Sequence, residues 1–149
     1  MAWKDDEFYE QAARVVRVKL GIDDQLRPDM FTVVIKLKHI GMIKDYVRVP
    51  DAEMPDDEAR YDPFEKLLYL RESTLCASSA MFLYSEEQRK RARFTIAHEI
   101  GHIALGHKNV RFRGKTASVA ESLVQRIRNE EHEANRFAAA FLAPAHLAT

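Results

Sequence analysis

The chain has 149 residues, 46% hydrophobic and 31% charged, and its 23 lysines and arginines balance its 23 aspartates and glutamates. This length predicts one domain with a core of its own, and the composition excludes a disordered or collagen-like chain. A formal net charge of zero argues against a dedicated nucleic-acid binder. The single cysteine, Cys76, excludes an internal disulfide and a four-thiolate zinc site.

The sequence carries neither a membrane span nor a secretion signal. No stretch approaches 18 uncharged apolar residues, which is about the length needed to cross a bilayer. Residues 1–7 are acidic and lack the apolar core of a signal peptide. We therefore expect a cytoplasmic protein.

The first half of the chain predicts two helices followed by a small sheet. Apolar residues at helical spacing indicate helices over 6–20 and 29–39, ended by Gly21 and Gly41. Residues 42–49 predict a strand that stops at Pro50. Residues 66–71 predict a buried strand with 80–84 as its hairpin partner, and the acidic stretch 51–62 is expected to be an exposed loop.

The second half is strongly helical. Ser85 and Gln88 form a candidate capping box that begins a helix running to about Leu105 and ending at Gly106. Residues 109–115 predict a basic loop. A long helix is expected over 119–142, either continuous or kinked near residue 128, and Pro144 closes it.

The first of these two helices contains the sequence His98-Glu99-Ile100-Gly101-His102. Residues four apart on a helix project from one face, so the two imidazoles can bind one Zn²⁺. Glu99 is adjacent to the first ligand but off that line, where it can reach a water molecule as a general base. Apolar residues cover most of this helix, and a buried helix tolerates such side chains only when they are paired or metal-bound.

A catalytic zinc site needs three protein ligands and one open position. Glu131 on the following helix can supply the third ligand oxygen. Asn135, four residues later on the same face, can accept a hydrogen bond from the far nitrogen of His98 and so orient it. The alternative ligands on this helix are Glu130, His132 and Glu133, although the acidic residues that do not bind metal are expected to be solvated.

The stretches FTIAHEIGH (94–102) and EHEANRFAAAFLAP (131–144) together resemble the ImmA/IrrE metallo-endopeptidase family, bacterial and phage zinc proteases of the gluzincin type. The resemblance implies the metal ligands His98, His102 and Glu131, with Glu99 as the catalytic base. It implies one α+β, zincin-like metallopeptidase domain over 1–149, and many relatives continue beyond the position of Pro144. In this domain a short antiparallel sheet packs on the HExxH helix and the following Glu-bearing helix.

The resemblance also implies a substrate class, namely helix-turn-helix repressors whose cleavage releases stress-response or mobile-element genes. This chain has no recognisable helix-turn-helix, so we expect the repressor to be a separate protein and expect no sequence-specific nucleic-acid binding. His107, Tyr84 and Arg136 are candidates to stabilise the oxyanion, although His107 more simply caps a helix end. Two basic clusters, 89–93 and 108–115, are interpreted as solvated charge, as a docking site for an acidic partner surface, or as a weak contact with DNA near a bound repressor.

Two other interpretations remain open. The protein is a non-catalytic regulator or toxin-type protein if its zinc is structural, in which case His107, His132 or Glu133 would close the fourth coordination position. A general peptidase would instead degrade many unfolded proteins. Mn²⁺ or Fe²⁺ fits the same ligands with less preference than Zn²⁺.

Overall fold

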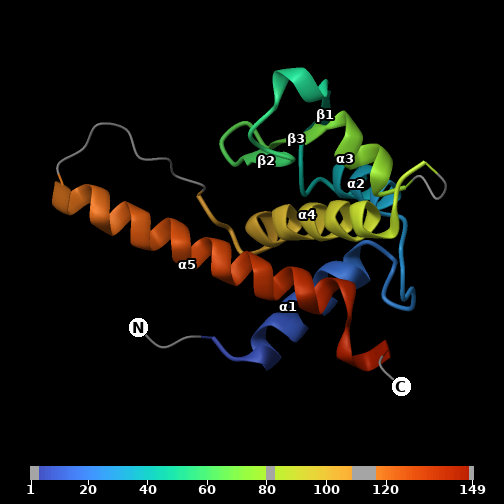
Figure 1. The fold of residues 1–149 in the computed structure, drawn as a ribbon. Helices are drawn as coiled ribbons and strands as arrows, with labels where there is room; N and C mark the ends of the chain where they lie inside the picture. Colours follow the sequence, from blue (N-terminus) through green and yellow to red (C-terminus); the bar gives the residue numbers. More distant parts are fainter. Residues whose placement is uncertain (1–3, 80–82, 109–116, 148–149) are drawn as a thin grey trace.

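The computed structural model describes residues 4–79, 83–108 and 117–147, with only the backbone of 117–123. Three strands lie on one side of a central helix, and two helices lie on its other side (Figure 1). The helices are α1 (Asp6–Lys19), α2 (Met30–His39), α3 (Glu72–Ala77), α4 (Glu86–Ala104) and α5 (Ala117–Leu142). The strands are β1 (Asp45–Val49), β2 (Ala59–Asp62) and β3 (Leu67–Arg71), and the short 3-10 turns are η1 (Asp51–Glu53) and η2 (Ala145–Leu147).

The small α+β architecture is confirmed, but the sheet is mixed rather than antiparallel. Its strand order is β1-β3-β2, with β1 parallel and β2 antiparallel to the central strand. The predicted hairpin with residues 80–84 is wrong for the part described, since Leu83 and Tyr84 form a bend; residues 80–82 lie outside the described chain. The antiparallel partner of β3 is instead β2, inside the stretch 51–62 expected to be a loop.

The strand β2 escapes prediction because it is short and its stretch is rich in acidic residues. Tyr61 packs into the core, while Arg60 on the other face lies over the ring of Tyr69, 5.3 Å from its centroid. Asp62 then starts the turn by accepting hydrogen bonds from the backbone N–H groups of Phe64 and Glu65. Pairing with β3 therefore overrides the local loop signals.

The helix α4 begins at the predicted capping box. The N–H of Gln88 donates to the hydroxyl of Ser85 at 3.2 Å, and the N–H of Ser85 donates to the side-chain oxygen of Gln88 at 2.9 Å. Both hydrogen bonds satisfy N–H groups that have no partner within the helix. The predicted start of this helix is therefore confirmed.

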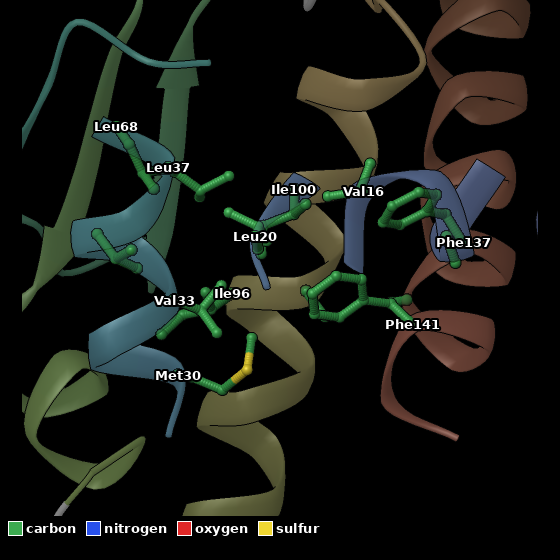
Figure 2. Packing of buried hydrophobic residues seen from close by; sticks show 14 of the residues in the cluster. Val16, Leu20, Met30, Val33, Leu37, Leu68, Ile96, Ile100, Phe137 and Phe141 are labelled. Atoms are coloured by element: carbon green, nitrogen blue, oxygen red, sulfur yellow. The ribbon is translucent and has the colours of Figure 1, made fainter. Parts of the chain in front are cut away.

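The core forms on both sides of α4 (Figure 2). Ile96 and Ile100 lie at its centre, with Phe137 and Phe141 of α5 on one side. The other side is filled by fully buried side chains of α2 and β3, namely Met30, Val33, Leu37 and Leu68. Because the same helix carries the histidine motif, this packing holds that motif against α5.

Gly101 lets α4 and α5 approach each other backbone to backbone. A Cβ at this position would lie 3.1 Å from the Cα and carbonyl oxygen of Ala134 and 3.2 Å from the Cβ of Phe137. Real Cβ atoms rarely approach so closely, so a larger residue would push the helices apart. The glycine of the motif is therefore a spacing residue that brings α5 close to the two histidines.

Within the described residues, no helix is both long enough and apolar enough to cross a membrane.

Candidate metal site between α4 and α5

The structure brings His98, His102 and Glu131 together. The Nε2 atoms of the two histidines are 3.1 Å apart. One oxygen of Glu131 lies 2.7 Å from Nε2 of His98, and its other oxygen lies 3.0 Å from Nε2 of His102. Three potential ligand groups, two from α4 and one from α5, thus converge on one point.

This arrangement fits a divalent metal ion. Two ligands at ~2.0–2.1 Å from a tetrahedral zinc ion are about 3.3 Å apart, close to the distance between the two Nε2 atoms. Two imidazoles and one carboxylate also match the donor types of catalytic zinc sites. The side chain of His102 is 2% exposed and that of Glu131 is 48% exposed, so one side of the site is buried and the other faces solvent.

Glu99 lies beside the same two histidines and is 8% exposed. One ligand atom from each of His98, Glu99 and His102 lies within 4.8 Å of the others. The carboxylate oxygens of Glu131 lie close to these rings, 2.7 Å from Nε2 of His98 and 3.0 Å from Nε2 of His102. The two acids therefore stand at different depths, with Glu131 in direct contact with the rings and Glu99 buried next to them.

The far nitrogens of the two rings have different partners. Nδ1 of His98 lies 2.7 Å from the side-chain oxygen of Asn135, which accepts its hydrogen bond as predicted. Nδ1 of His102 lies 2.9 Å from Nδ1 of the buried His107. Both Nε2 atoms are therefore left pointing at each other and at Glu131.

The contact to His107 continues through α5 to the N-terminal segment. Nε2 of His107 lies 2.9 Å from one oxygen of Glu133, and Nζ of Lys4 lies 2.7 Å from the other. Sequence reasoning missed this chain of contacts and expected Glu133 to be solvated, whereas its side chain is 15% exposed. The available signal is Gly106, whose positive φ of 68° turns the chain directly before His107.

The electrostatics of the site favour an ionised Glu131. The close imidazoles of His102 and His98 hold the pKa of the Glu131 carboxyl far below its ordinary range. Burial lowers the pKa of His98, but the hydrogen bond and charge of Glu131 raise it by more, so the pKa lies above its ordinary value. Burial lowers the pKa of His107. At neutral pH the third group is thus a carboxylate able to bind a cation.

The candidates for oxyanion stabilisation do not gather at the site. Arg136 pairs with Asp6 and lies 4.9 Å from the centre of the Tyr9 ring, so it faces α1. His107 is held behind His102, and Tyr84 lines a separate small cavity with Gln88 and Ala92. His39, His132 and His146 are exposed.

The basic residues at the start of α4 line a cavity of about 950 Å³. Its wall includes Arg27, Arg89, Lys90, Arg91 and Arg93. Phe94 also lines it and is 39% exposed, with its ring centre 6.5 Å from that of His98. Phe94 therefore lies both at this cavity and near His98. Of the second basic cluster only Lys108 lies within the described residues.

Comparison with known proteins places the whole site within one family. No curated protein matches the chain. The family model described as the IrrE N-terminal-like domain (Peptidase_M78) matches residues 50–148, more than half of the chain, including α4 and α5. This family supports a metallopeptidase-type function. The chain belongs to the IrrE N-terminal-like peptidase family.

Proposed function

We propose that the protein is a zinc-dependent endopeptidase that cleaves a helix-turn-helix repressor at one site and so derepresses stress-response or mobile-element genes. The observation that carries this proposal is the convergence of His98, His102 and Glu131 at 2.7–3.1 Å, with Glu99 buried beside them. The family assignment supports the peptidase class. The substrate follows from the resemblance and makes the protein cytoplasmic, where such repressors act.

His98, His102 and Glu131 would hold the metal ion. When bound there, zinc supplies Lewis-acid activation of a water molecule and of a peptide carbonyl. Glu99 takes a proton from the water as its oxygen bonds to the carbonyl carbon. The same carboxyl then passes the proton to the amine nitrogen as the carbon–nitrogen bond breaks, which returns Glu99 to its ionised form.

The surroundings of the ligands favour a catalytic over a structural metal site. A structural zinc site is closed by a fourth protein ligand. His107 and Glu133, two of the candidates for that role, are bonded to each other on the far side of His102. The half-exposed Glu131 also leaves the site accessible to a substrate from solvent.

The cavity beside the N-terminal half of α4 suits an acidic segment of the substrate. Arg27 and Arg93 both line it, and the positive charge of Arg27 adds to burial in lowering the pKa of Arg93. Its acids are already engaged: Asp29 caps α2, Glu58 pairs with Arg91 and Glu86 pairs with Lys90. The remaining positive charge would attract carboxylates of a bound peptide.

The proposal is tested by comparing the wild-type protein with the Glu99→Gln variant. We expect both to retain about one zinc per chain by metal analysis, because Glu99 is not a ligand. Co-expression with a candidate helix-turn-helix repressor should give a single cleavage by mass spectrometry with the wild type and none with Glu99→Gln. Glu87→Gln, an exposed change on the same helix, should cleave normally.

Two results would contradict the proposal. Full cleavage by Glu99→Gln would show that Glu99 is not the catalytic base. Absence of zinc from the wild type would contradict the metal site. If the protein degraded casein and the repressor equally well, it would be a general peptidase and not a site-specific one.

A further inference from the structure

The far side of His102 carries a chain of hydrogen bonds that the mechanism above does not use. It runs from Nδ1 of His102 to Nδ1 of His107 at 2.9 Å, and from Nε2 of His107 to Glu133 at 2.9 Å. Lys4 closes the chain by contacting the second oxygen of Glu133 at 2.7 Å. His102 and His107 are 1% and 7% exposed, so water cannot readily replace either contact.

The chemistry of these groups determines where the hydrogens lie. A carboxylate only accepts hydrogen bonds, so Nε2 of His107 must carry the hydrogen that Glu133 accepts. In a neutral imidazole Nδ1 is then an acceptor, and the hydrogen between the two rings belongs to Nδ1 of His102. Nε2 of His102 is consequently left with its lone pair, directed towards Nε2 of His98 and the carboxylate of Glu131.

The end of α4 places His107 for this purpose. Gly106, in a left-handed conformation, reverses the chain, and the backbone N–H of His107 donates to the carbonyl of His102 at 3.0 Å. The ring of His107 thereby returns against the helix it has just left, 5.1 Å from the centre of the His102 ring. On α5, Glu133 lies two residues after Glu131 and so reaches His107 instead of the two facing Nε2 atoms.

We propose that His107 and Glu133 are positioning residues that fix the tautomer and orientation of His102 and thereby keep its Nε2 atom ready for the metal ion. Lys4 holds Glu133 in place. This inference rests on the proposed metal site but is independent of the substrate. It separates the two histidines, because His98 is oriented by an exposed amide, whereas His102 is oriented by the buried ring of His107, which in turn contacts Glu133.

The first test measures zinc affinity by competition with a chromogenic chelator. His107→Phe removes the acceptor for Nδ1 of His102 and should weaken zinc binding by about 10- to 100-fold. His107→Asn places an amide oxygen near the position of Nδ1 and should restore most of the affinity. His39→Phe, the same change at an exposed position of α2, should leave the affinity unchanged.

The second test needs no variant at the site. In the zinc-loaded wild-type protein, nitrogen-15 NMR of the imidazoles should show His107 protonated at Nε2 and unprotonated at Nδ1. The opposite tautomer would overturn the proposal.

The affinity measurements can overturn it as well. Wild-type affinity in His107→Phe would show that His102 needs no acceptor, and equal losses in His107→Phe and His107→Asn would reduce His107 to a packing residue. Because the wild type serves as the reference, a wild-type protein without zinc would contradict the metal site itself. That failure is distinguishable from a failure of the tautomer assignment.

Discussion

Two clusters of buried polar side chains lie along α5, one near its middle and one at its C-terminal end, and they are satisfied in different ways. In the middle, His102 and His107 are bonded to other side chains, all of them titratable. At the end, the guanidinium of Arg17 on α1 is fully buried and donates to backbone carbonyls alone. These are the carbonyls of Phe141, Ile22 and Gln25.

This difference distinguishes a cluster that stabilises the fold from a cluster that can bind a ligand. The carbonyls that bind Arg17 tie the end of α5 to α1 and to the turn after α1. The side chains around His102 direct their donor atoms to one point, where a cation can bind. Buried polarity by itself therefore does not identify a functional site, whereas converging ligand atoms do. The first two variants below each change one cluster.

The largest expected effect is the loss of zinc from His98→Ala. Removing this ligand leaves two protein ligands, so metal analysis should fall from about one zinc per chain to near zero. The ring of His98 lies at the edge of the site, with its side chain 15% exposed. The metal-free variant should therefore unfold within about 1 kcal/mol of the metal-free wild type in urea. A variant that kept its zinc would remove His98 from the ligand set.

The converse variant is Arg17→Met, which should damage the fold and spare the metal site. It removes the guanidinium donor from the carbonyls of Phe141, Ile22 and Gln25, although the carbonyl of Ile22 still accepts from the N–H of Gln25. Urea unfolding should therefore show a loss of about 3 kcal/mol. Arg14→Met is the matched control, since Arg14 makes only an exposed ion pair with Asp23 at 3.4 Å and should change stability by less than about 1 kcal/mol. Equal effects of the two variants would show that the Arg17 cluster contributes nothing special.

Much of this architecture can be predicted from sequence where the signals are local. The capping box at Ser85, the i,i+4 spacing of His98 and His102, and the hydrogen bond between His98 and Asn135 all depend on residues within one helix or on facing turns of two helices. The sheet depends on pairing between distant segments. Its parallel β1–β3 contact and the short strand β2 therefore carry no sequence signal of comparable strength.

The roles of Arg17 and His107 could not be predicted for a related reason. Arg17 lies in an amphipathic helix where a charged residue is expected at the surface. Its three carbonyl acceptors come from the turn after α1 and from the distant end of α5. His107 acts through a chain reversal and a contact with a second helix. Both roles arise from tertiary packing, which a single sequence does not display.

The spacing between α4 and α5 connects the two clusters, and Gly101→Ala should disturb both. Its Cβ would meet the backbone of Ala134 at 3.1 Å, so the helices must separate, at a cost of about 1–3 kcal/mol in urea unfolding. Because Glu131 lies on α5, zinc affinity should fall as well. Gly41→Ala is the control: its φ of 81° strains any other residue, but nothing lies within 4 Å, so it should lose about 1 kcal/mol and keep wild-type zinc affinity.

The smallest expected effect concerns the exposed partner of His98. Asn135→Leu removes the acceptor for Nδ1 of His98, and zinc affinity measured by chelator competition should fall by about tenfold. Asn135→Asp keeps an acceptor and should bind zinc as the wild type does, and Asn129→Leu, on the same helix but bonded to Gln125, should have no effect.

The size of this loss can be compared with the loss expected when the buried partner of His102 is removed. Water can replace an exposed amide but not a buried ring, so His107→Phe should weaken zinc binding more than Asn135→Leu. If Asn135→Leu weakened zinc binding more than His107→Phe, burial of the partner would not explain how strongly that partner supports its histidine.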